Sequence, residues 1–256
     1  MHLKSVILLV IACTLVACNW SASDTDKPAI TTDTLKYEYK IIERKSADCS
    51  NKKDSGCIVA KIKYPVFIGQ KLLNDTVSHH LLIQFGIADK PDNNLQQLAD
   101  DFLKSGRDFR LNANTEVIRE DSSILIMELS GYRFLGGARG YTLANFINWN
   151  TKAGKKIELK DILTDGYAKS LNSIAEKIFR KQEKLSDSTA LKPNYLFAEG
   201  KFELNNNFLI TPIGIRFLYN QCEIKPYPAG ETNLLIPYSD ILSLLRPNTV
   251  ITQYIK

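Results

Sequence analysis

Apolar and polar residues alternate along several short stretches of this chain, which is the pattern of half-buried β-strands. This alternation, together with two short apolar runs, predicts strands over residues 35–41, 57–66, 115–118, 124–129, 141–149, 208–210, 215–219 and 234–236. Apolar residues recur at helical spacing in other stretches. That spacing predicts helices over residues 72–85, 94–109 and 165–184, and shorter helical segments over 160–163 and 241–245.

The predicted strands and helices follow one another without a regular strand–helix–strand repeat. Such an order favours an α+β fold, in which a mostly antiparallel sheet is packed by helices. We expect the helices on one face of that sheet, and two intertwined subdomains. The apolar positions expected to face inwards are Ile62, Leu73, Val77, Leu125, Met127, Phe146, Leu171, Ile178, Phe217 and Ile236.

The first eighteen residues follow a different pattern, that of an export signal. Lys4 precedes an apolar run over residues 6–16, and Cys18 follows shortly after it. The run is too short for a permanent membrane span. Residues 15–18, Leu-Val-Ala-Cys, resemble the lipobox of bacterial lipoproteins, which implies that Cys18 carries a lipid and becomes the first residue after cleavage. An ordinary signal peptide cleaved nearby is the alternative, and both interpretations predict export.

Composition and charge limit the class of partner. Residues 1–17 are expected to be removed, and the polar residues 18–36 to form a flexible tether. The formal net charge is +5 without a run of Lys or Arg, so nucleic acid is not expected as a partner. Lipidation predicts attachment to a membrane. Asn19, rather than aspartate, follows the lipidated cysteine, which favours the outer membrane or the cell surface.

Three cysteines remain after the predicted signal and lipid site. In an oxidising compartment, Cys49 and Cys57 are expected to form a disulfide across the short loop between two strands. Closing this loop contributes about 2–3 kcal/mol in the chain-entropy model. Cys222 is then left as a small apolar side chain, although its pairing with Cys49 or Cys57 stays open.

Two groups of motifs resemble a known family. The first comprises Gly-Gly-Ala-Arg-Gly at 136–140, Asn-Phe-Ile-Asn-Trp at 145–149 and the stretch 151–163. The second comprises residues 207–219, the stretch 223–230 that ends in Pro-Tyr-Pro-Ala-Gly, and Ile-Pro-Tyr at 236–238. Together they resemble the extracellular domain shared by RsiV-type anti-sigma factors and stand-alone bacterial lipoproteins. The resemblance places an RsiV-like subdomain at residues 131–256.

The preceding segment is similar to a second domain. Residues 37–86, with Lys-Tyr-Pro at 63–65 ending a strand, resemble the accessory domain that precedes the catalytic domain of PdaC-type peptidoglycan deacetylases. This implies an accessory-like subdomain at residues 37–130. The RsiV-type domain binds lysozyme outside the cell, so the resemblance implies a lipid-anchored binding or sensor module. Its ligand would be a protein such as lysozyme or a cell-wall glycan such as peptidoglycan.

Four residues are candidates for ligand binding. Arg139, where the family commonly has histidine, lies in a glycine-rich segment and is suited to pairing with a carboxylate or phosphate. The alternative is a tight turn that opens the next strand, with a solvated Arg139. Tyr219, Tyr227 and Tyr238 are candidates for an aromatic binding surface near two prolines. The alternative is a well-packed loop whose path the prolines fix.

The sequence gives little support to catalysis. It contains no Gly-x-Ser-x-Gly motif and no zinc-binding spacing. Asp75 and His79 share one face of a predicted helix, but a metal needs at least one further ligand. We therefore expect neither a metal nor another cofactor, and a binding protein rather than an enzyme. The alternative is an enzyme acting on peptidoglycan or another envelope polymer, which requires a cleft that gathers two acidic groups.

Overall fold

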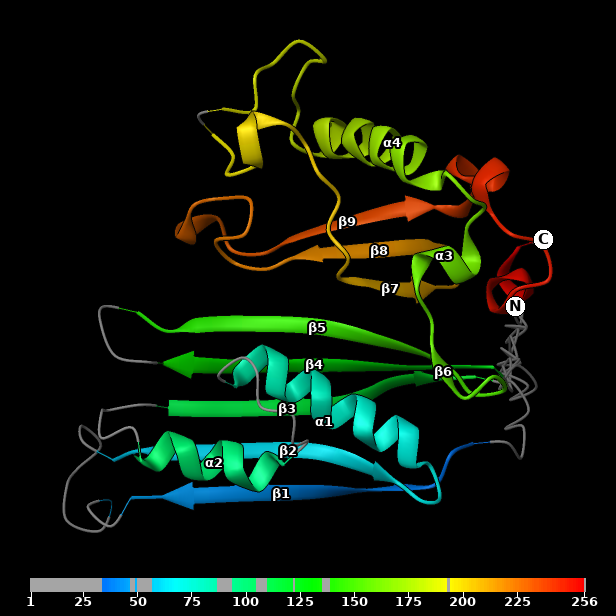
Figure 1. Cartoon of the computed structure of the whole chain (residues 1–256). Coiled ribbons are helices and arrows are strands. Elements are labelled where there is room, and N and C mark those ends of the chain that lie inside the picture. The colour runs from blue at the N-terminus through cyan, green and yellow to red at the C-terminus, as the bar shows by residue number, and fades with distance from the viewer. Residues whose placement is uncertain are drawn as a thin grey trace, which may run out of the picture. The chain divides into compact units, whose positions relative to one another are not determined.

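The computed structural model describes residues 34–46, 49, 57–86, 94–104, 110–121, 123–134, 139–192 and 194–255 (Figure 1). The chain from Asp33 onwards forms one compact unit. The predicted signal peptide, Cys18 and most of the predicted tether lie outside the described residues. Among the described residues, no helix is long and apolar enough to cross a membrane.

Six strands form the larger sheet, in the order in which they occur along the chain. They are β1 (Tyr37–Lys45), β2 (Val59–Phe67), β3 (Arg110–Glu120), β4 (Ile124–Phe134), β5 (Tyr141–Asn150) and β6 (Lys155–Lys156). Neighbouring strands are antiparallel except β2 and β3, which are parallel because two helices cross over between them. The expected α+β fold with a mostly antiparallel sheet is confirmed.

Helices α1 (Lys71–Phe85) and α2 (Leu95–Lys104) form this crossover and lie over one face of the larger sheet (Figure 1). The apolar spacing that predicted α1 reappears as a buried stripe, since Leu73 and Val77 are fully buried against the sheet. The exposed side of α1 carries polar groups such as the ion pair between Lys71 and Asp75.

Three antiparallel strands form the smaller sheet, namely β7 (Phe208–Thr211), β8 (Gly214–Tyr219) and β9 (Thr232–Pro237). The predicted turn joins β7 to β8, and Thr211 Oγ1 accepts the Gly214 N–H at 3.1 Å. A Cβ atom at Gly214 would lie 2.2 Å from the carbonyl oxygen of Ile236, so the close approach of β9 requires glycine here.

Two further helices precede the smaller sheet, α3 (Leu159–Ile162) and α4 (Tyr167–Gln182). Helix α4 buries Leu171 and Phe179 in the same core as the smaller sheet. The helix predicted over 241–245 is wrong: short 3₁₀ segments take its place, η4 (Tyr238–Asp240) and η5 (Leu242–Leu244). Other 3₁₀ segments are η2 (Ala198–Gly200), η3 (Tyr227–Ala229) and η6 (Val250–Tyr254).

Strand β4 separates two hydrophobic cores. Leu125, Met127 and Leu129 pack with α1 and α2, whereas Ile124 and Ile126 pack with the smaller sheet and α4. This division follows from the alternation of side chains along a strand. Helices α1 and α2 therefore cover one face, as expected. The expectation does not hold for α4, which packs with the smaller sheet in the core on the other side of β4, and the sequence did not predict this second layer.

The two expected subdomains are not separated where the sequence placed their boundary. The boundary expected between residues 130 and 131 falls inside β4, so both predicted subdomains contribute to the larger sheet. The residues expected to face inwards are buried, with the exception of Ile178, which is only partly buried at the edge of the core.

Three asparagines join the two sheets at the edge of β5. Asn148 of β5 donates to a backbone carbonyl of β7 at 2.8 Å and accepts a backbone N–H of β7 at 2.9 Å. Asn207 and Asn220 accept backbone N–H groups of β5 at 3.1 and 2.7 Å. The side chains of Asn207 and Asn220 thus bond backbone groups along the open edge of β5, which the two-residue strand β6 does not cover. We call Asn148, Asn207 and Asn220 the asparagine seam.

Candidate functional site

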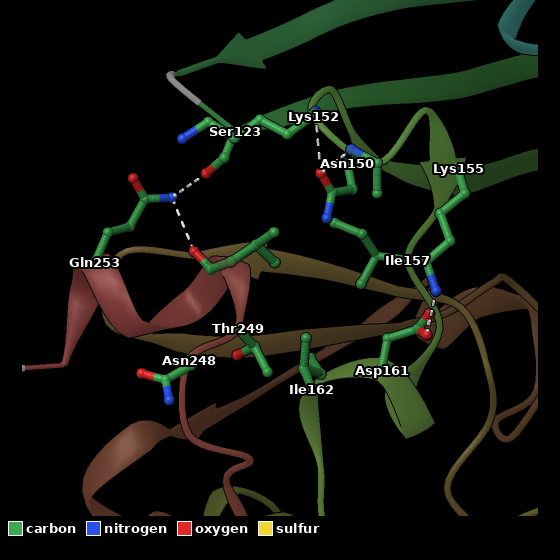
Figure 2. Close-up of a pocket in the computed structure, with 12 residues that line it drawn as sticks. Ser123, Asn150, Lys152, Lys155, Ile157, Asp161, Ile162, Asn248, Thr249 and Gln253 are labelled. Carbon is green, nitrogen blue, oxygen red and sulfur yellow. Dashed lines mark hydrogen bonds and ion pairs between the residues drawn. The ribbon is translucent and has the colours of Figure 1, made fainter.

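A cleft of about 740 Å³ opens where the turn between β5 and β6, helix α3 and the segment η6 meet (Figure 2). We call it the junction cleft. Its lining residues are Ser123, Asn150, Lys152, Ala153, Lys155, Ile157, Asp161, Ile162, Asn248, Thr249, Val250 and Gln253. They come from three separate parts of the chain, so only the folded structure brings them together.

Asn150 organises the turn on one side of the junction cleft. Its Oδ1 accepts the backbone N–H groups of Lys152 at 3.1 Å and Ala153 at 2.9 Å, which is the hydrogen bonding of an Asx turn. Within the described part of the chain, the Nδ2 group of Asn150 and the ammonium of Lys152 have no hydrogen-bond or ion-pair partner. Both groups are therefore available to a ligand.

The opposite side of the junction cleft carries an ion pair. Lys155 Nζ lies 2.7 Å from Asp161 Oδ1, and the second carboxylate oxygen accepts the Glu158 N–H at 2.8 Å at the start of α3. Burial alone would raise the pKa of Asp161, but the hydrogen bond from Glu158 and the Lys155 ammonium together lower that pKa. The Asp161 carboxylate is thus ionised, and Lys155 and the Glu158 N–H occupy its two oxygens.

Polar contacts hold η6 in place as the third wall. Gln253 Nε2 donates to Ser123 Oγ at 3.2 Å, and Arg119 donates to the Tyr254 hydroxyl at 2.7 Å. The Tyr254 hydroxyl in turn donates to Asp121 at the turn between β3 and β4. In Figure 2 Asn150, Ile157 and Ile162 lie between the Gln253–Ser123 contact and the Lys155–Asp161 pair. The junction cleft is therefore preformed, with an aliphatic floor and a polar rim.

Two of the predicted binding residues meet elsewhere on the surface. The guanidinium of Arg139, just before β5, lies 4.6 Å from the ring centroid of Tyr227 in η3. Arg139 is exposed and Tyr227 is half-buried. Neither residue lines the junction cleft. The first part of the glycine-rich motif, residues 136–138, lies outside the described residues.

The predicted aromatic surface of three tyrosines is wrong, because two of them are core residues. Tyr219 is 1% exposed and its hydroxyl donates to the Glu203 carbonyl at 2.8 Å. Tyr238 is 5% exposed and its hydroxyl donates to the Thr211 carbonyl at 3.0 Å. Burial raises the pKa of both phenols, so they stay neutral. Only Tyr227 remains a candidate from this set.

The predicted disulfide is confirmed. Cys49 and Cys57 are bonded, with Cα atoms 4.7 Å apart. Cys222, half-buried, is the free cysteine of the described residues. The proposed lipid site at Cys18 lies outside them.

The histidines of α1 have separate surroundings. His79 is exposed, whereas His80 Nε2 lies 3.2 Å from Lys156 Nζ. Burial, the Lys156 ammonium and His79 lower the pKa of His80 to about 4. Asp75 pairs with Lys71 at 2.5 Å. Among the described residues, no three His, Cys, Asp or Glu side chains are grouped so that they could hold a metal ion.

The architecture is thus an α+β domain with two sheets, two cores and a preformed polar cleft at their junction. Part of it corresponds to a family: the model of a family described as a protein of unknown function, DUF3298, matches residues 160–239. The matched range holds α4 and the smaller sheet. A comparison with curated proteins gives no match.

Two solved structures have a similar fold. A DUF3298 family protein from Pseudomonas aeruginosa PAO1 has a TM-score of 0.72 and 23% sequence identity, over 84% of this chain and 96% of that chain. A member of the same family from Bacteroides fragilis NCTC 9343 has a TM-score of 0.69 and 21% identity, over 86% of this chain and 97% of that chain. Both likenesses extend well beyond residues 160–239 and concern the fold.

Proposed function

We propose that this chain is a lipid-anchored protein of the bacterial envelope, and that its folded domain binds a cell-wall glycan in the junction cleft. The signal pattern that ends in Cys18 supports the anchor and the exported location. The observation that carries the proposed binding is the junction cleft itself, about 740 Å³ in volume, lined by amide, hydroxyl and charged groups around an apolar floor.

The chemistry of this lining suits an acylated sugar. Sugar hydroxyl and acetamido groups need donors and acceptors, which the exposed Asn248 side chain and the Nδ2 group of Asn150 offer on the rim. The apolar face of a sugar ring fits against Ala153 and Val250, the lining apolar residues that are not fully buried. The ammonium of Lys152 is suited to the carboxylates that cell-wall glycans carry on their lactyl and peptide groups.

Binding is better supported than catalysis. The alternative, an enzyme that cleaves an envelope polymer, needs a pair of carboxyl groups or another group that can transfer protons. Asp161 is the carboxylate among the lining residues, and its charge is engaged by Lys155 and by the backbone of α3. Glycan binding, in contrast, needs no pair of proton-transferring groups in the junction cleft.

A protein ligand such as lysozyme is the second candidate, and one observation favours it. Arg139 and Tyr227 form a cation–π pair on the surface, and arginine and tyrosine are enriched among the residues that dominate protein interfaces. The resemblance to the RsiV-type sensor domain points in the same direction.

The two candidates are separated by calorimetric titration of the chain lacking residues 1–18. Soluble peptidoglycan fragments and lysozyme are the two titrants. Asn150→Asp keeps the acceptor that the turn needs but removes the Nδ2 donor, and Lys152→Gln removes the free charge. Lys177→Gln, at an exposed position of α4, is the matched control.

We expect saturable glycan binding that weakens about tenfold in each cleft variant, roughly the loss of one hydrogen bond to a charged or polar group. The control is expected to bind like the wild type. Lysozyme binding that weakens in Arg139→Ala and Tyr227→Ala would establish the second candidate instead. Glycan binding that no cleft variant changes, or no glycan binding, would refute the proposed site.

A further inference from the structure

The connection between β2 and α1 carries two exposed aliphatic side chains. Ile68, directly after β2, is 70% exposed, and Leu72, in the first turn of α1, is 61% exposed. A single exposed aliphatic residue is ordinary, but two within one short connection indicate a contact surface. The five residues of the connection, Ile-Gly-Gln-Lys-Leu at 68–72, include no carboxylate. We call residues 68–72 the apolar tip.

Asn74 fixes the backbone of the apolar tip. Its Oδ1 accepts the Phe67 N–H at 2.8 Å, and its Nδ2 donates to the Phe67 carbonyl at 2.9 Å. The Asn74 N–H donates to the Gln70 carbonyl at 3.0 Å where α1 begins. Gly69 has a φ of +72°, the left-handed backbone that favours glycine. Because hydrogen bonds already hold the backbone of the tip, a partner does not have to order it on binding.

The predicted tether enters the folded domain beside the apolar tip. The Lys36 carbonyl, just before β1, accepts the Ile68 N–H at 2.8 Å. Tyr37 then pairs with Phe67 in the register of β1 and β2. The entry of the chain and the apolar tip are therefore hydrogen-bonded neighbours at the end of the larger sheet where β1 begins and β2 ends (Figure 1).

The length of the tether limits the distance between this end of the sheet and the lipid. About sixteen residues lead from Cys18 to Thr34. A coil of this length, as the sequence predicts, spans about 20–24 Å on average and at most about 55 Å when fully extended. A short tether of this kind holds two surfaces at an effective concentration in the millimolar range. A membrane contact too weak to hold a free protein is therefore sufficient for an anchored one.

We propose that the apolar tip docks on the surface of the lipid bilayer, with Ile68 and Leu72 inserted at the boundary between headgroups and acyl chains. Apolar side chains of surface-bound proteins reach about 5–10 Å into this region. Anionic headgroups do not oppose the approach, because the tip has no carboxylate and the exposed Lys36 beside it has no ion-pair partner among the described residues. The inference rests on the proposed lipid anchor, but not on glycan binding in the junction cleft.

The test places a fluorescent reporter in the apolar tip. Ile68→Trp is made in the chain lacking residues 1–20, which removes Trp20 and leaves Trp149, 2% exposed, as the native tryptophan. Phosphatidylcholine vesicles with brominated acyl chains are added at millimolar lipid, which supplies the concentration that the tether would provide. We expect the brominated lipid to quench the reporter fluorescence, whereas unbrominated vesicles do not.

The matched control is Ile83→Trp in the same chain. Ile83 is 64% exposed and lies on the same helix, about 17 Å from Leu72 along the helix axis. It presents an equally accessible tryptophan away from the apolar tip. We expect brominated lipid to quench this variant no more than the chain without a reporter. Thermal unfolding of each variant shows whether the fold is retained.

Leu72→Ser, combined with Ile68→Trp, tests whether insertion drives the contact. Because one of two inserted side chains is lost, we expect the lipid concentration for half-maximal quenching to rise about tenfold. No quenching of Ile68→Trp, equal quenching of Ile83→Trp, or no effect of Leu72→Ser would each overturn the proposal.

The outcome is separable from that of the proposed function. The vesicle assay uses a chain without Cys18, so it does not depend on the lipid anchor. The anchor is tested by the membrane fraction of the full chain against that of Cys18→Ala, and the glycan site by its own titration. Ile68 and Leu72 do not line the junction cleft, so variants of the apolar tip are expected to leave glycan binding unchanged.

Discussion

Replacing Asn148 by alanine is the sharpest test of the asparagine seam. Asn148 is 2% exposed and links β5 to β7 through both ends of its amide. Its Nδ2 donates to the Phe208 carbonyl at 2.8 Å, and its Oδ1 accepts the Ile210 N–H at 2.9 Å. Asn148→Ala would leave both backbone groups buried without a partner.

The magnitude follows from the number of orphaned groups. Each buried polar group without a hydrogen bond costs about 1–3 kcal/mol, so we expect Asn148→Ala to lower the free energy of unfolding by about 2–6 kcal/mol. A loss of this size is a large part of the stability of a domain, which is typically about 5–15 kcal/mol.

The assay is urea unfolding followed by circular dichroism, with the free energy of unfolding taken from the midpoint and slope. Asn145→Ala is the matched control, because Asn145 lies on the same strand, is half-buried and has no side-chain hydrogen bond within the described residues. We expect this control to change the free energy by about 0.5 kcal/mol or less. A loss below about 1 kcal/mol for Asn148→Ala would refute the inference that the seam holds the two sheets together.

Two other predictions concern titration and the cysteines. Because the pKa of His80 is about 4 in the folded protein and near 6.5 when exposed, the contribution of His80 to stability is present above pH 6.5 and is lost as the pH falls towards 4. Urea midpoints between pH 7 and 4 are therefore expected to fall less steeply in His80→Gln than in the wild type. Identical slopes in the two proteins would contradict this. Alkylation of the denatured, unreduced chain lacking residues 1–18 is expected to label Cys222 alone by mass spectrometry, and label at Cys49 or Cys57 would count against the disulfide.

Local patterns in the sequence were sufficient to predict the strands, the longer helices and the faces of these elements that point into a core. The alternation around Leu125 and Met127 correctly placed both residues in a core, since side-chain direction along a strand is a local property. The parallel pairing of β2 with β3 and the separation of β7, β8 and β9 into a second sheet were not predicted. Both depend on which strands meet in space, and periodicity carries no information on that.

The candidate site was less accessible to sequence reasoning. The turn that begins at Asn150 was predicted, but its proximity to η6 depends on contacts between residues about one hundred positions apart. Burial of Tyr219 had a usable signal, because Tyr219 follows Phe217 by two residues and so shares the face of a strand that was already expected to point inwards. Arg139 and Tyr227 were both singled out, yet nothing in the sequence indicated that they contact each other.

The position of β4 between two cores has a consequence for the order of folding during synthesis. The core beside α1 and α2 draws its buried residues from Ile42 to Trp149, so it can close once about the first 150 residues have emerged. The other core extends from Ile124 to Ile251, so it can close only after about a hundred more residues have emerged. In that interval Ile124 and Ile126 remain uncovered on a sheet that is already formed. We therefore expect a chain that folds as it emerges to pass through a half-built state with an exposed apolar face.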